Sequence, residues 1–315
     1  MIINFVTEYI PDIVITNDYF LDNYSISNEE IIDKSGIKER RRTQPIENTN
    51  SMAIEAVKKG FFELPFPIDE IDLIIGATYT PYDTVGTLAH AVQAYFKIEK
   101  AKCFTISSAC SSFVNALEVV DTFFTAGKAN KALLVVSENN SLYNDFSDPK
   151  SSFLWGDGAA AVFISKERCS DDDFEVIDVT SKGLGTVGKN IEGIYLRPSK
   201  GGLKMPFGRD VFQYACNYLI EETEQILESN GLSISELNYF IPHQANKRII
   251  DFVVKKLKID PGKVLNNIEY LGNTGSASTA IALAQNKHKF IKGDTIAIAV
   301  FGGGYSSGAV LLRKL

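Results

Sequence analysis

The chain contains few of the residues that build metal centres and disulfide frameworks. Its 315 residues include only four cysteines and three histidines. The cysteines are scattered along the chain and form no CxxC pair, at positions 103, 110, 169 and 216. We therefore expect neither a disulfide scaffold nor a metal site.

An excess of positive charge is also absent. The chain has 32 Lys and Arg residues against 39 Asp and Glu residues, which gives a formal net charge of −7. Proteins that bind nucleic acids usually carry a basic excess, so we expect no nucleic-acid partner.

The sequence lacks long apolar runs and targeting segments as well. The longest uncharged run, 295–312, is interrupted by glycines and serines, which disfavours a membrane span. The first ten residues hold no basic stretch of the kind that opens a signal peptide. We therefore expect no membrane span and a reducing, cytoplasmic compartment.

The second half of the chain repeats the pattern of the first half. Ile71–Ala77 is typical of a buried strand with its exit, and Leu237–His243 has the same pattern. The same spacing aligns the turn 109–112 with 275–278. We interpret the chain as two related halves, 1–167 and 168–315, with two related sheets packed as one body.

Strand and helix patterns alternate along both halves. This alternation predicts an α/β fold with mostly parallel central strands. Hydrophobic periodicity predicts strands at 73–77, 102–106 and 132–137, and helices at 51–60, 87–96, 111–126, 211–230 and 247–257. The acidic run Asp171-Asp172-Asp173 predicts a solvated turn.

Cys110 is the candidate nucleophile. It stands in Ser107-Ser108-Ala109-Cys110-Ser111-Ser112, between a predicted strand and a predicted helix. The helix dipole and free N–H groups at a helix N-terminus favour an anion, so we expect a lowered thiol pKa. A small buried apolar residue is the alternative interpretation. The other three cysteines fit structural roles better.

Three further positions are candidate partners of this thiol. His243 ends an apolar strand, where functional groups gather in α/β sheets. Asn273 stands in the second-half counterpart of the Cys110 turn, and the run Gly302-Gly303-Gly304 allows N–H groups to approach a substrate oxygen. A satisfied buried histidine, a left-handed turn residue and a tight bend are the structural alternatives.

These motifs together carry a family resemblance. In order along the chain they are Gly36-Ile37-Lys38-Glu39-Arg40, Cys110, Pro242-His243-Gln244-Ala245-Asn246, Gly272-Asn273-Thr274 and Phe301-Gly302-Gly303-Gly304. The pattern resembles the β-ketoacyl-acyl-carrier-protein synthase III family, within the thiolase-like superfamily. The resemblance implies a five-layered αβαβα fold of two duplicated halves, a homodimer and no cofactor.

The resemblance also implies a reaction. Cys110, His243 and Asn273 would form the catalytic set, and the N–H groups of Cys110 and Gly303 would form the oxyanion hole. Cys110 would accept an acyl group from a thioester. The acyl group would then condense with a malonyl or β-ketoacyl extender on an acyl carrier protein, with His243 and Asn273 donating hydrogen bonds to the enolate oxygen.

Several positions differ from the usual family pattern. Glu30 and Lys34 replace the Trp and Arg that contribute to coenzyme A binding, which disfavours that donor. Val85 is a smaller residue at the position of the gate that the partner subunit provides, and Phe301 is expected at the substrate tunnel. Docking of the acidic carrier is assigned to Arg248, Lys247 and Arg40.

These differences favour an acyltransferase of a specialised lipid, pigment or secondary-metabolite pathway. One alternative is initiation of fatty acid synthesis from acetyl-coenzyme A and malonyl carrier protein. Another is a partner subunit that transfers acyl groups or binds carriers without condensing them. A thioester hydrolase would differ in its product, because it forms no carbon–carbon bond.

Overall fold

The computed structural model describes residues 1–315, and a mixed sheet of nine strands is its largest feature. The strand order is β11-β12-β13-β8-β1-β7-β6-β4-β5. The strands are β1 (Ile2–Tyr9), β4 (Leu73–Ala77), β5 (Lys102–Ile106), β6 (Lys131–Glu138), β7 (Gly158–Ser165), β8 (Phe174–Gly183), β11 (Tyr239–Pro242), β12 (Thr295–Gly302) and β13 (Ser306–Lys314). The shortest strand pairing in the sheet is that of β1 with β8, which joins Ile2 to Glu175 and Ile3 to Phe174.

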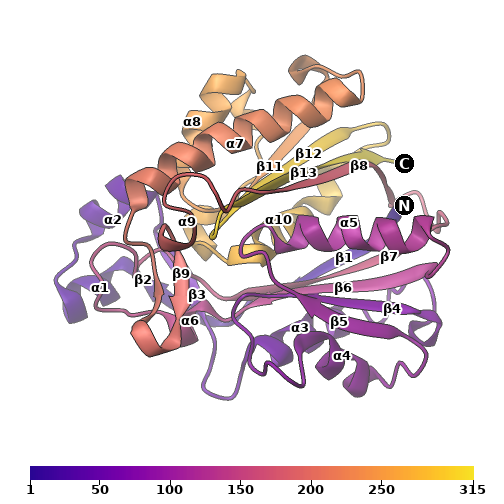
Figure 1. Ribbon diagram of the computed structural model, residues 1–315, viewed down its shortest axis with the longest axis horizontal. Helices are drawn as coiled ribbons and strands as arrows, with labels where there is room; N and C mark the ends of the chain where they lie inside the picture. The colour runs from indigo at the N-terminus through magenta and orange to yellow at the C-terminus, as the bar shows by residue number, and fades with distance from the viewer.

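Helices cover both sides of each sheet half and produce the predicted layers (Figure 1). The main helices are α3 (Thr49–Lys59), α4 (Leu88–Phe96), α5 (Ser112–Thr125), α7 (Gly208–Ser229), α8 (Lys247–Leu257) and α10 (Ser278–Asn286). α5 contacts β4 and β8, and α10 contacts β1 and β11, so both lie between the sheet halves. α3 and α4 cover one outer face, and α7 and α8 cover the other. The largest apolar core cluster, of 35 buried residues, therefore joins the two sheet halves through α5 and α10.

Strand pairing repeats between the two halves. β4 runs parallel to β6, and β6 runs antiparallel to β7. In the same way β11 runs parallel to β12, and β12 runs antiparallel to β13. We propose on this ground that 1–167 and 168–315 are the two duplicated units. β5 has only a reduced counterpart, a single bridge between Phe240 and Val264.

The smaller elements lie outside this repeat. They are β2 (Ile13–Thr16), α1 (Asn17–Tyr24), α2 (Asn28–Ser35), β3 (Glu39–Arg42), α6 (Asn140–Tyr143), β9 (Tyr195–Arg197), β10 (Gly202–Lys204) and α9 (Ile268–Leu271). β2 pairs with β3, and β9 pairs with β10, as two separate two-stranded antiparallel sheets. Among all helices, none is both long enough and apolar enough to cross a membrane.

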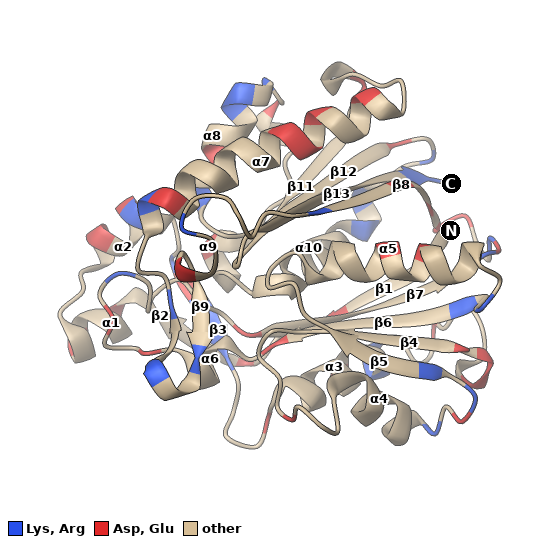
Figure 2. Cartoon of the chain, viewed as in Figure 1, with Lys and Arg blue, Asp and Glu red and all other residues tan.

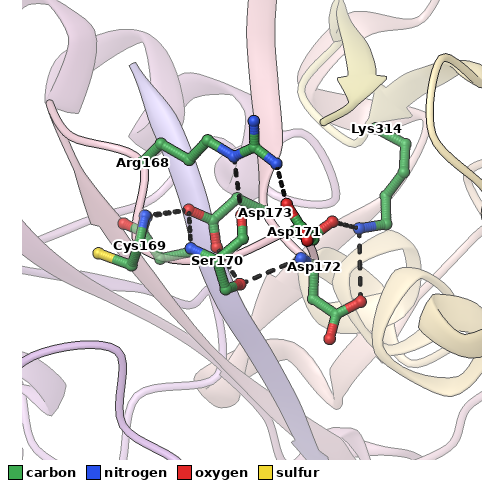
Figure 3. A network of polar contacts seen from close by, with 8 residues as sticks. Arg168, Cys169, Ser170, Asp171, Asp172, Asp173 and Lys314 are labelled. Carbon is green, nitrogen blue, oxygen red and sulfur yellow. Dashed lines mark hydrogen bonds and ion pairs between the residues drawn. The ribbon is translucent and has the colours of Figure 1, made fainter.

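The segment between β7 and β8 corrects one sequence prediction (Figure 3). Asp171 and Asp172 are exposed, as expected of a solvated turn, but Asp173 is fully buried. Its carboxylate accepts hydrogen bonds from Asn4 Nδ2 at 2.8 Å and from the backbone N–H of Cys169 at 2.6 Å. A buried carboxylate needs such donors. Asp173 therefore holds the segment between β7 and β8 against β1 through hydrogen bonds.

Candidate active site

Cys110 lies in a sharp turn between β5 and α5. Ala109, the residue before it, has a φ of 49°, in the left-handed region that residues other than glycine rarely adopt. Ser112 stabilises the turn, because its Oγ accepts from the N–H of Ser108 at 2.8 Å and donates to the carbonyl of Ala109 at 2.6 Å. The turn presents Cys110, which is buried, at the start of α5.

The pKa of this thiol contradicts the sequence prediction. Burial, and to a smaller extent the nearby Glu138 carboxylate, raise the pKa of Cys110 to about 12. Hydrogen bonding from the N–H groups of Gly303 and Cys110 and from the Tyr79 hydroxyl lowers the pKa only in part. The expected lowering by the helix N-terminus is therefore wrong, because loss of hydration outweighs the local donors.

The glycine run approaches the Cys110 turn from the other half of the molecule. A Cβ atom on Gly302 would lie 2.9 Å from the carbonyl oxygen of Ser108 and 3.0 Å from the backbone nitrogen of Cys110. Only glycine allows the end of β12 to come this close. The approach brings the N–H groups of Gly303 and Cys110 to the sulfur, where they are also near the oxygen of an acyl group carried on it.

His243 directly follows β11 and is buried. Its Nδ1 lies 2.8 Å from Ser278 Oγ, which also accepts from the N–H of Gln244 at 3.4 Å. The Ser278 hydroxyl fixes the orientation of the ring, and when it donates to Nδ1 the ring carries its own proton on Nε2. Burial lowers the pKa of His243 to about 3, and the imidazole stays neutral near pH 7.

Asn273 is fixed on both its backbone and its side chain. Its N–H donates to the carbonyl of Leu154 at 2.7 Å, and its carbonyl accepts from the N–H of Gly156 at 3.0 Å. Its Oδ1 accepts from the N–H of Gly275 at 2.9 Å. The amide oxygen is therefore occupied, and the Nδ2 group remains available as a donor.

Two cavities meet at Cys110. The first, of about 70 Å³, is lined by Cys110, His243, Asn273 and Phe301 among mostly apolar residues. The second, of about 370 Å³, is lined by Cys110 together with Tyr79 and the 191–197 segment. The structure thus brings the three predicted catalytic residues to one cavity, at the carboxyl ends of β5 and β11.

A buried carboxylate beside the site was missed by sequence reasoning. Glu138, at the end of β6, accepts from the N–H groups of Tyr79 at 3.2 Å and Thr80 at 3.1 Å. Ser276 lies in the short helical turn Gly275–Ala277, which directly follows Asn273 and Thr274. Its hydroxyl also donates to the Glu138 carboxylate. Burial raises the pKa of Glu138 to about 7. Glu138 thereby links the loop after β4 to the Asn273 segment.

The prediction that Arg40 helps to dock the carrier is wrong. Arg40 is 2% exposed, and its guanidinium donates to the Phe153 carbonyl at 2.7 Å and to Asn17 Oδ1 at 2.8 Å. It also lies 4.7 Å from the centre of the Phe20 ring. Arg40 therefore stabilises the interior and presents no charge to a carrier.

The other predicted residues lie on the surface. Arg248 is exposed and follows Asn246, which lines the first cavity. Lys247 forms an ion pair with Asp251 at 2.7 Å. Val85 is 86% exposed and lines neither cavity of its own chain.

Comparison with known proteins identifies the family. The family described as "3-Oxoacyl-[acyl-carrier-protein (ACP)] synthase III" matches residues 104–185, and its C-terminal part matches residues 227–314. A β-ketoacyl-[acyl-carrier-protein] synthase III of Rhodospirillum centenum is 34% identical over 313 residues, covering 97% of this chain and 96% of the relative. The chain belongs to the β-ketoacyl-acyl-carrier-protein synthase III family.

Other synthase III proteins show the same likeness over nearly the whole chain. The one from Aquifex aeolicus is 37% identical over 307 residues, covering 97% of this chain and 96% of the relative. A crystal structure of the synthase III from that organism has a TM-score of 0.92 at 35% identity and covers 99% of both chains. These comparisons confirm the resemblance, the thiolase-like fold and an acyltransferase of the condensing type.

Proposed function

We propose that this synthase III carries out the initiating condensation of fatty acid synthesis, joining an acyl primer to a malonyl group on an acyl carrier protein. The convergence of Cys110, His243 and Asn273 on one apolar cavity carries this proposal. Synthase III relatives that span nearly the whole chain favour initiation over the specialised pathway that the sequence analysis preferred.

The first step is acyl transfer to the thiol. The Cys110 sulfur attacks the carbonyl carbon of the primer thioester, and the N–H groups of Cys110 and Gly303 hold the resulting oxyanion. Collapse of the tetrahedral intermediate breaks the carbon–sulfur bond of the donor. The thiol proton leaves with the donor sulfur, and Cys110 retains the acyl group.

The second step forms the new carbon–carbon bond. Loss of CO₂ from the malonyl thioester leaves negative charge on the thioester oxygen, where His243 Nε2–H and Asn273 Nδ2–H donate hydrogen bonds. Both donors are neutral and fixed by Ser278 and Gly275, so they need little rearrangement. The enolate carbon attacks the acyl carbon and expels Cys110 as thiolate, which then takes up a proton.

The surface around α8 suits an acidic carrier protein. Figure 2 shows Lys and Arg on α8, whereas Asp and Glu lie along the neighbouring α7. Arg248 is exposed beside the Asn246 wall of the cavity, so a carrier bound there can pass its thioester arm toward Cys110. Lys247 contributes less, because Asp251 offsets its charge.

Coenzyme A is a suitable primer carrier despite Glu30. The Glu30 carboxylate pairs with Lys34 at 2.5 Å on the surface of α2. This pairing offsets the negative charge that Glu30 would otherwise present to the phosphates of coenzyme A. The carbonyl of Lys34 accepts from Asn246 Nδ2 at 2.9 Å, so the pair lies close to the mouth of the first cavity.

A second copy of the chain is the expected partner at the β5 end of the sheet. The opposite end is covered, because Leu265 donates its N–H to the carbonyl of Phe240 in β11. β5 pairs with β4 alone and leaves its outer edge open. Open edges of sheets favour pairing with another strand. Val85 stands exposed in the loop between β4 and α4, which is consistent with a gate offered to the partner.

The experiment is a turnover assay with acetyl-coenzyme A and malonyl carrier protein. The expected products are a 3-oxoacyl carrier protein, CO₂ and free coenzyme A in equal amounts. Cys110→Ala is the matched control and should form no product. Release of free acetate without a new carbon–carbon bond would contradict the proposal and favour a hydrolase.

A further inference from the structure

Tyr79 brings a phenol hydroxyl to a cavity that Cys110 also lines, and no motif of the sequence pointed to it. Tyr79 lies in the loop after β4, and its N–H donates to the buried Glu138 carboxylate at 3.2 Å. Its side chain and Cys110 line the same cavity. Hydrogen bonding from Tyr79 lowers the pKa of the Cys110 thiol, which favours its anionic form.

The hydroxyl proton has a defined acceptor while the thiol is neutral. Tyr79 donates to Asn140 Oδ1 at 2.7 Å. The Asn140 amide cannot turn over, because its Nδ2 donates to the carbonyls of Gly156 at 2.8 Å and Asn273 at 3.3 Å. In this state the phenol oxygen is free to accept a hydrogen bond, and the Cys110 S–H group is a nearby donor.

The ring itself is held in place. A Cβ atom on Gly275 would lie 2.4 Å from the Tyr79 hydroxyl oxygen, and Gly275 has a φ of 58°. The phenol oxygen is therefore packed against the Asn273 segment. Its O–H bond can still rotate away from Asn140 without any movement of the ring.

The reaction needs such a donor at the sulfur. Cys110 carries negative charge when it attacks the primer and again when condensation expels it. Burial and the Glu138 carboxylate both oppose that charge, and the neutral imidazole of His243 supplies no positive charge. Besides the N–H groups of Gly303 and Cys110, the Tyr79 hydroxyl is the donor at hand.

We propose that Tyr79 is a further catalytic residue, whose hydroxyl turns from Asn140 to the Cys110 sulfur whenever the sulfur becomes a thiolate. The phenol keeps its proton throughout, because burial holds the Tyr79 pKa well above its usual value. Only a hydrogen bond changes partner. The thiol proton still leaves with the sulfur of the acyl donor.

This inference builds on the proposed role of Cys110, and alkylation by iodoacetamide tests it separately because no acyl donor is involved. Tyr79→Phe keeps the ring and removes the hydroxyl. We expect its Cys110 alkylation rate to fall about tenfold at every pH from about 6 to 9, with an unchanged slope against pH. The acylation rate with acetyl-coenzyme A should fall by a similar factor.

The matched control is Tyr143→Phe, which removes a hydroxyl that donates to the Pro81 carbonyl at 2.7 Å. It should alkylate at the wild-type rate. Replacement of Tyr79 by 3-fluorotyrosine keeps the fold contacts and makes the hydroxyl a stronger donor, so alkylation should be faster than in the wild type. Wild-type rates in Tyr79→Phe, equal losses in both Phe variants, or no gain with 3-fluorotyrosine would overturn the proposal.

Discussion

At the scale of single residues, the side chains of the candidate site are held in place by their neighbours. His243 is the clearest case, because Ser278 occupies Nδ1 and burial lowers its pKa to about 3. Cys110 and His243 were predictable from the strands that precede them, and Asn273 was predictable from the turn that matches the Cys110 turn. The protonation states were not, because they depend on burial by segments that are distant in the sequence.

The first prediction concerns the pH dependence of stability at His243. In the unfolded chain the imidazole takes up a proton below about pH 6.5, whereas the folded protein keeps it neutral. The contribution of His243 is therefore present above that pH and is lost as the pH falls. Relative to His243→Gln, the wild type should lose about 2 kcal/mol of unfolding free energy between about pH 7 and 5.

Denaturant titrations of both proteins at several pH values provide the measurement. His288 is exposed, so His288→Gln is the control and should keep the wild-type pH dependence. Parallel curves for wild type and His243→Gln would show that the folded imidazole titrates normally.

At the scale of elements, loops at the carboxyl ends of strands bring the site together. The pattern of the sequence predicted β4, β5 and α8 with their observed bounds, because buried faces impose clear periodicities. Glu138 and Tyr79 escaped prediction because their partners come from β4, β6 and the Asn273 segment. A glutamate at the end of an apolar strand was the one available signal.

Arg40 is predicted to stabilise the elements under the Asn273 turn. A Cβ atom on Gly272 would lie 3.0 Å from Arg40 Cβ, so the arginine packs directly against that turn. Arg40→Met removes the donors to Phe153 and Asn17 and should lower the unfolding free energy by about 3 kcal/mol. Chemical denaturation measures this loss. An unchanged stability would contradict a structural role for Arg40.

Arg248, in contrast to Arg40, is predicted to bind the carrier at the surface and not to stabilise the fold. Arg248→Glu should leave stability nearly unchanged and raise the KM for malonyl carrier protein about tenfold at low salt. The effect should shrink as salt is added, because exposed charges are screened. Lys292 is an exposed lysine in the turn that precedes β12, outside α8. Lys292→Glu is therefore the matched control and should keep the wild-type KM. Equal effects of both variants would contradict docking at α8.

At the scale of the whole molecule, the fold brings Cys110 from the first part of the chain to one cavity with His243 and Asn273 from the last part. The internal repeat and the helix–sheet alternation made this arrangement predictable from the sequence. The continuity of the sheet through the short β1–β8 contact was not predictable, because those few pairs leave no periodic pattern.

The open edge of β5 predicts that the protein is a dimer in solution. One chain has a mass of 34.7 kDa, and sedimentation at micromolar concentration should give twice that mass. Thr105→Pro places a proline within β5, where it should weaken strand pairing between copies. A monomer in the wild type would contradict the assignment of this edge to a second copy.

The most direct test of the account is the mass of the intact protein during a two-stage reaction. Acetyl-coenzyme A alone should add one acetyl group at Cys110, and a later addition of malonyl carrier protein should remove it as 3-oxoacyl product. His243→Ala should take up the acetyl group and keep it, while Cys110→Ala should take up none. An acetyl group on another residue, or full discharge by His243→Ala, would contradict the roles assigned to these residues.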